Sequence, residues 1–128
     1  MKRVIIGKNK FLKLEDVEAV SRKKAGVSID SNAFRAMESS NSVLKKFIKR
    51  RVPIYGVSTQ FGGDAHRIEK TLNQKNETIY LRALKERQSN LIKSHDCGLV
   101  ENAPPDVVRA AMLLRAQTLS RGMSGVRP

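Results

Sequence analysis

The sequence is poor in the residues that stabilise small domains most strongly. Of its 128 residues none is tryptophan, four are phenylalanine and two are tyrosine. Because aromatic side chains normally contribute large buried areas, a self-sufficient core is not assured, although the length suits one domain. The single cysteine, Cys97, excludes an internal disulfide, and no apolar run approaches the roughly 20 residues that a membrane-spanning helix needs. These absences predict a cytoplasmic protein that does not enter a membrane.

Acidic residues are also scarce, with 12 Asp and Glu against 25 Lys and Arg and a formal net charge of +13. Such a chain should attract an acidic protein, a nucleic acid or an anionic membrane, and its self-repulsion favours a partner. Basic runs such as Arg22-Lys23-Lys24 are more often solvated helix faces than binding patches. Because no RNA- or DNA-binding motif accompanies them, nucleic-acid binding is a disfavoured alternative.

Metal ligands and nucleophile motifs are equally sparse. His66, His95 and Cys97 lack the further ligands, at suitable spacing, that a zinc site needs, so we expect no metal in this chain. No nucleophile elbow or phosphate-cradling loop is present. The simplest interpretation makes His95 a helix-end residue bonded to a backbone carbonyl and Cys97 a small buried hydrophobe.

Hydrophobic spacing predicts a mainly α fold, with a short amino-terminal strand ending at Gly7 and helices after it. Helices are expected over 15–26, from residue 30 or 31 to just before Pro53, weakly over 66–72, and over 78–95 and 105–121. One face of helix 78–95 should carry Leu81, Leu84, Gln88, Leu91 and His95. Helix 105–121 is apolar on nearly every side, so it should be buried all round, with the cover supplied from outside this chain.

The stretch 53–64 contains three glycines and no sustained period, so it predicts an ordered loop. Tyr55 stands between Pro53 and Gly56, and glycines let the backbone approach a ligand closely. Two interpretations remain open. Tyr55 is either a buried anchor of a tight connection or an aromatic hydroxyl offered to a ligand.

Several blocks together resemble the aromatic amino-acid ammonia-lyase family, in particular its histidine type. Residues 53–62, Pro-Ile-Tyr-Gly-Val-Ser-Thr-Gln-Phe-Gly, are similar to the family's Tyr-Gly-Val-Asn-Thr-Gly-Phe-Gly loop. Residues 88–95, Gln-Ser-Asn-Leu-Ile-Lys-Ser-His, resemble the helix that lines its substrate pocket, and segments 14–17, 108–116 and 124–128 also agree. The resemblance covers nearly all of 1–128 as a single segment and implies the amino-terminal part of the lyase helical fold.

The resemblance also implies roles for individual residues. Tyr55 would be the general base that takes the β-proton of the substrate, which requires its phenol to ionise more readily than in water. Ser94 and His95 would contact the substrate side chain as the selectivity pair, with Gly62 also at the substrate. The residues expected to shape the loop are Gly56, Thr59, Gln60 and Phe61. Ser58 and Gln60 replace the usual Asn and Gly, and Gln60 adds bulk where the loop is normally bare.

The electrophile of the family is a methylidene-imidazolone formed from an internal Ala-Ser-Gly, which this sequence does not contain. The resemblance therefore implies a small subunit, inactive alone, of a split enzyme that acts on histidine or an aromatic amino acid. A separately encoded large subunit would carry the methylidene-imidazolone, in a hetero-oligomer built on a tetrameric core. Elimination and an aminomutase shift both stay open. A non-catalytic stabilising or regulatory partner of a lyase-like protein is the alternative, which Gln60 favours, whereas retention of Tyr55 favours the enzyme.

Overall fold

The computed structural model describes residues 3–64, 75–96, 98 and 101–128. The chain forms two compact units. The strand unit comprises Met1–Lys45 and Glu101–Pro128, and the loop unit comprises Lys46–Val100. Each unit has its own cluster of buried apolar side chains. Across the described residues, no helix is both long enough and apolar enough to cross a bilayer.

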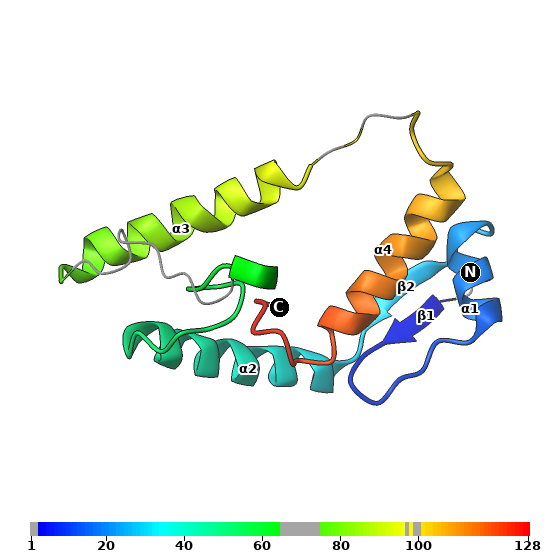
Figure 1. Cartoon of the computed structure of the whole chain (residues 1–128). Helices are drawn as coiled ribbons and strands as arrows, with labels where there is room; N and C mark the ends of the chain where they lie inside the picture. Colours follow the sequence, from blue (N-terminus) through cyan, green and yellow to red (C-terminus); the bar gives the residue numbers. More distant parts are fainter. Residues whose placement is uncertain (1–2, 65–74, 97, 99–100) are drawn as a thin grey trace. The chain divides into compact units, whose positions relative to one another are not determined.

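The strand unit is built on a parallel strand pair and two helices (Figure 1). Strand β1 (Arg3–Ile6) pairs with β2 (Gly26–Ile29), and helix α1 (Leu14–Ser21) lies in the connection between them. Alternate residues of a strand point to opposite faces, so Val4 and Ile6 face inward together. They pack with Val20 and with Leu113 of α4 (Pro105–Leu119) to form the core.

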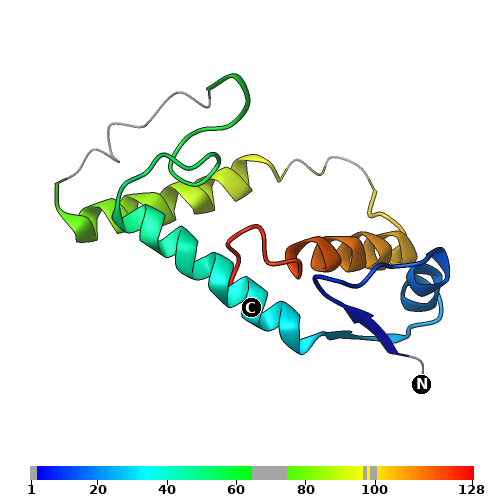
Figure 2. The same cartoon turned by 90° about the horizontal axis from the view of Figure 1, so that it is seen from below.

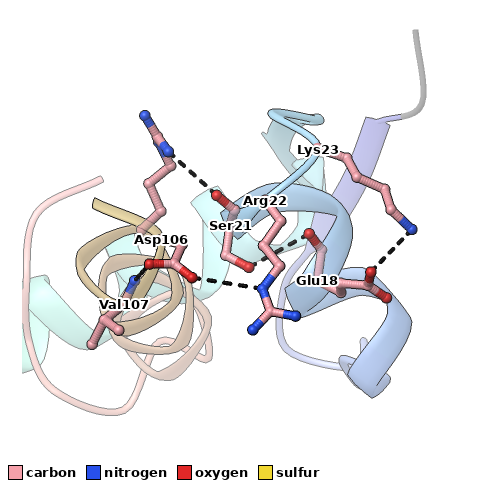
Figure 3. Close-up of polar contacts among 7 residues, drawn as sticks. Glu18, Ser21, Arg22, Lys23, Asp106 and Val107 are labelled. Carbon is pink, nitrogen blue, oxygen red and sulfur yellow. Dashed lines mark hydrogen bonds and ion pairs between the residues drawn. The ribbon is translucent and has the colours of Figure 1, made fainter. Parts of the chain in front are cut away.

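Polar contacts join α1 to the first turns of α4 (Figure 3). Arg22 pairs with Asp106 at 3.6 Å, and Arg109 donates a hydrogen bond to the carbonyl oxygen of Ser21 at 3.3 Å. Lys23 pairs with Glu18 within the α1 end at 3.1 Å. Both ion pairs are exposed to solvent, so they contribute little to the free energy of unfolding and mainly orient the side chains that form them.

Helix α2 (Ser31–Lys49) starts where the Asp30 carboxylate accepts a hydrogen bond from the Asn32 backbone N–H at 2.8 Å. The carboxyl-terminal segment returns along this helix (Figure 2). Asn41 donates to the Gly125 carbonyl at 2.6 Å, and the Gly125 N–H donates to Ser40 at 2.9 Å. These bonds tie the chain after α4 to the first part of α2.

The loop unit contains the end of α2, the loop 53–64 with its 3₁₀ turn (Gly62–Asp64), and α3 (Glu77–Ser94). The Asn76 side chain caps α3 by accepting hydrogen bonds from two of its first N–H groups. Tyr80 and Leu84 of α3 are buried against Ile48. The Arg51 guanidinium lies 4.7 Å above the Tyr80 ring, a cation–π contact at the same junction.

The mainly α fold is confirmed. The strand predicted to end at Gly7 agrees closely with β1, and the helices predicted from residue 30 or 31 to just before Pro53, over 78–95 and over 105–121 agree closely with α2, α3 and α4. The prediction for the first helix is wrong at its end, because the chain leaves α1 at Ser21 and enters β2. The predicted face of helix 78–95 is also shifted, since Tyr80, Leu84 and Arg87 are the buried residues. The weak helix expected over 66–72 lies outside the described residues.

Helix α4 differs from its prediction in burial. Only Leu113 and Gln117 are buried, whereas Val107 and Leu114 are exposed and Met112 is 66% exposed. Within the strand unit, α4 therefore keeps an apolar face in solvent. The described residues do not supply the cover that its sequence requires.

Candidate functional site

The loop 53–64 has a defined internal shape. The Ile54 carbonyl accepts hydrogen bonds from the backbone N–H groups of Val57, Ser58 and Thr59. The Ser58 hydroxyl accepts from the Ile54 N–H at 2.8 Å and donates to the Val52 carbonyl at 3.3 Å. Ser58 and Thr59 are buried, so this turn is the interior of the loop. Ser58, where the resembled family has Asn, thus closes the turn with its own side chain.

Tyr55 projects from this turn and is 68% exposed. Its hydroxyl oxygen accepts a hydrogen bond from the Gly62 N–H at 3.0 Å. Gly62 has φ +64°, a left-handed conformation that favours glycine and aims its N–H back at the ring. The interpretation of Tyr55 as a buried anchor is therefore wrong. The loop offers the phenol to its surroundings.

The loop lies beside α3 (Figure 2), and two neighbouring side chains of this helix hold it by hydrogen bonds. Arg87 donates to the carbonyls of Val57, at 2.9 Å, and Thr59. Gln88 donates to the carbonyls of Gly56 and Val57, each at 2.9 Å. Arg87 is only 8% exposed. Sequence reasoning missed Arg87, although its position one turn after Leu84 places it on the buried face of α3.

Ser94 and His95 lie at the carboxyl end of α3. The Ser94 hydroxyl donates to the Leu91 carbonyl at 2.9 Å. His95 Nδ1 lies 2.9 Å from the same carbonyl and 3.0 Å from the Ser94 oxygen. The contact with the Leu91 carbonyl agrees with the simplest expectation for His95. Phe61 meets the His95 ring edge to face at 5.0 Å between centroids, so the loop and the helix end are in contact.

A polar hollow of about 220 Å³ lies beside these groups. Its described lining consists of Gln60, Arg87, Asn90, Leu91 and Ser94. Gln60 of the loop and Ser94 of the expected selectivity pair therefore share one space, which Tyr55 does not line. Gln60, where the resembled family has Gly, is thus one of the residues that line this space.

The described residues contain no group of three or more His, Cys, Asp or Glu side chains that could hold a metal ion. Cys97 and His66 lie outside the described residues. The chain also has no Ala-Ser-Gly from which a methylidene-imidazolone could form. What this part of the chain presents is an exposed phenol, a helix end with a serine and a histidine, and a polar hollow.

The fold is that of a class of solved lyase and aminomutase structures. A tyrosine aminomutase from Streptomyces globisporus is similar over 98% of this chain and 22% of that chain, with a TM-score of 0.81 and 26% sequence identity. The sequence profile of the family described as aromatic amino acid lyase matches residues 12–128. The chain belongs to the aromatic amino acid lyase family.

Curated relatives extend the comparison. A histidine ammonia-lyase from Caldanaerobacter subterraneus subsp. tengcongensis is 37% identical over 99% of this chain and 23% of its own length. A histidine ammonia-lyase from Treponema denticola is 38% identical over 91% of this chain and 21% of its own length. The chain thus spans about a quarter of the length of these relatives.

Proposed function

We propose that this chain is the small subunit of a split ammonia-lyase and that it supplies the Tyr55 loop to an active site completed by a separately encoded large subunit. The observation that carries the proposal is the exposed Tyr55 phenol on a loop whose shape and seat are fixed by hydrogen bonds. Membership of the lyase family supports the reaction class. The exposed apolar side chains of α4 support the need for a second chain to cover them.

In this assignment the ionised form of Tyr55 is the general base: its phenolate oxygen accepts the β-proton of the substrate and becomes the phenol. The Gly62 N–H orients that oxygen, and the turn closed by Ser58 keeps the ring outside the loop. General base catalysis of this kind typically contributes about 10²- to 10⁴-fold. The methylidene-imidazolone of the large subunit would supply the electrophile that activates the substrate for loss of ammonia.

Substrate choice is assigned to the helix end. Ser94 and His95 resemble the selectivity pair of the histidine-type enzymes, and the curated relatives above are histidine ammonia-lyases. Histidine is therefore the first substrate to test, with tyrosine and phenylalanine next. Because a tyrosine aminomutase shares the fold, an amino-group shift is the second candidate reaction.

The partner would cover α4 and offset the charge of this chain. The exposed apolar side chains of α4 call for a hydrophobic interface, and a charge of +13 favours an acidic partner surface. We place the hetero-oligomer on a tetrameric core, as the resemblance to the family implies. The single cysteine agrees with a reducing, cytoplasmic setting for the complex.

A second candidate function is a non-catalytic partner that stabilises or regulates a lyase-like large chain. The observation that favours it is Gln60, which replaces the usual Gly of the family and lines the polar hollow together with Ser94. In that case the assembled complex forms normally and releases no ammonia from any amino acid.

The test is purification of a tagged copy of the chain from its own cells, followed by identification of what copurifies. We expect one stoichiometric lyase-like chain that contains Ala-Ser-Gly. Purification of the tagged chain alone, as a monodisperse and cooperatively melting monomer, contradicts the split-subunit proposal. A lyase-like partner without Ala-Ser-Gly supports the non-catalytic alternative.

A further inference from the structure

The contacts of Arg87 and Gln88 are concentrated on the backbone that follows Tyr55. The carbonyls of Gly56, Val57 and Thr59 accept hydrogen bonds from these two side chains. A guanidinium carries its donors in a fixed planar fork, so binding two carbonyls at once fixes both their spacing and their direction. The amide nitrogen of Gln88 bridges the first two carbonyls in the same way.

The hydrogen bonds inside the loop do not attach it to α3. Those centred on the Ile54 carbonyl and the Ser58 hydroxyl join loop residues to one another or to Val52. They determine the shape of the turn, whereas the bonds from Arg87 and Gln88 determine where the turn sits on α3.

Helix α3 connects this seat to the expected selectivity pair. Arg87 and Ser94 are seven residues apart, two helical turns, so they share a face at a separation of about 10 Å along the axis. Both line the polar hollow. The other end of α3 is anchored by Tyr80 and Leu84 against Ile48. Because Arg87 holds the loop on the helix that carries Ser94, it also sets the position of Tyr55 relative to Ser94 and His95.

We propose that Arg87 and Gln88 are positioning residues that hold the Tyr55 loop on α3 and thereby align the base with the substrate-selecting helix end. The kinetic part of this inference rests on the proposed function. The anchoring of the loop does not. Neither residue is proposed as a catalytic group, because the hydrogen bonds described above join both side chains to the backbone of the loop.

Loss of these bonds should free the loop without removing the base. A small displacement of a reacting group can reduce turnover by about 10²-fold, so we expect Arg87→Met to lower kcat by about 10- to 100-fold. KM should stay nearly constant if substrate binding is unchanged. Arg87→Lys keeps the charge but not the fork, so it should recover only part of the activity.

The experiment measures hydrogen exchange over residues 55–62 and steady-state kinetics in the assembled complex, for wild type, Arg87→Met, Arg87→Lys and Gln88→Leu. Arg82→Met is the matched control, because Arg82 is an exposed residue of α3 that pairs with Glu86 at 3.0 Å. We expect faster exchange over 55–62 and lower kcat in the Arg87 and Gln88 variants, and wild-type behaviour in the control. If Arg87→Met does not assemble, Gln88→Leu carries the test.

Unchanged exchange over 55–62 in the Arg87 and Gln88 variants overturns the proposal. Faster exchange with an undiminished kcat overturns the proposed role of Arg87 and Gln88 in aligning Tyr55. If wild-type complex shows no turnover while exchange responds as expected, the proposed function fails and the anchoring stands. The exchange measurement needs no activity, so the two failures are distinguishable.

Discussion

Each of the two units is stabilised internally by a different kind of interaction. In the strand unit, Val4, Ile6, Val20 and Leu113 form a small apolar core. In the loop unit, side-chain donors hold the loop 53–64 by its backbone carbonyls, and the apolar cluster lies nearer the amino-terminal end of α3. Apolar packing is non-directional, whereas hydrogen bonds fix orientation. Substitutions in the strand unit should therefore affect stability first, and those in the loop unit should affect turnover first.

The largest effect is expected at Tyr55. Tyr55→Phe removes the proposed base and leaves the ring, so turnover should fall by about 10²- to 10⁴-fold while assembly is unchanged. Tyr80→Phe is the matched control, because Tyr80 is the only other tyrosine of the sequence. Its side chain is buried near the start of α3. Ammonia release and size-exclusion chromatography of both variants are the measurements. Equal turnover in the two variants would remove Tyr55 from the mechanism.

The strand unit should respond most strongly at Ile6. Ile6 is 0% exposed and its neighbour Ile5 is 51% exposed on the opposite face of β1. Ile6→Ala should lower the free energy of unfolding by about 2–5 kcal/mol through lost burial and a cavity, with turnover per assembled complex retained. Urea unfolding of the complex is the measurement, with Ile5→Ala as control. Similar losses for both substitutions would contradict the assigned core.

Two glutamines allow the same substitution in both units. The Gln117 side chain accepts from the Gly7 N–H at 3.1 Å and donates to the carbonyls of Gly7, at 3.1 Å, and Lys10, at 2.7 Å. Gln117→Leu removes the acceptor of the buried Gly7 N–H and one of the two hydrogen bonds to the Gly7 carbonyl, which keeps its bond from the Lys10 N–H, so we expect a loss of about 1–3 kcal/mol in stability. Gln88→Leu should instead act mainly on kcat. Thermal melting and steady-state kinetics of the two variants are the measurements. If both variants lose stability and turnover to the same extent, the distinction between the two units is wrong.

The smallest effect is expected at His95. His95→Leu removes the ring that meets Phe61 and replaces a polar group at the helix end with an apolar one. The ratio of kcat/KM for phenylalanine over histidine should rise by about 10-fold, the low end for a changed pocket contact. Kinetics on both substrates measure this ratio. A ratio that does not change makes His95 a structural residue that only ends α3.

Most of the helices and much of the loop could be predicted from the sequence, because the signals that mark them are local. Asp30 and Asn76 act as caps and Pro105 starts α4, and each signal sits within a turn of the feature it marks. Strand β2 was missed because its four residues gain their structure only by pairing with β1, far away in sequence. Pairing of this kind leaves a weak local pattern in so short a segment.

The site shows the same division. The resemblance directed attention to Tyr55 and to residues 94 and 95, but not to Arg87, which sits in a charged run that suggests a solvated surface. Its spacing from Leu84 indicates the buried face of α3, but the loop carbonyls that its guanidinium binds come from a segment about 30 residues away, which no local pattern encodes. The exposure of Tyr55 accompanies a turn that the Ser58 side chain closes within the loop, and the glycines of the loop do not by themselves indicate which way the ring points.

The most direct test of the central claim is reconstitution of turnover from separate chains. This chain, its copurifying large chain, and an equimolar mixture are each assayed for ammonia release from histidine, tyrosine and phenylalanine under the same conditions. We predict that neither chain alone releases ammonia and that the mixture does, from histidine before the other two. A large chain that is fully active without this one, or a stable complex that releases no ammonia from any of the three, would contradict the account.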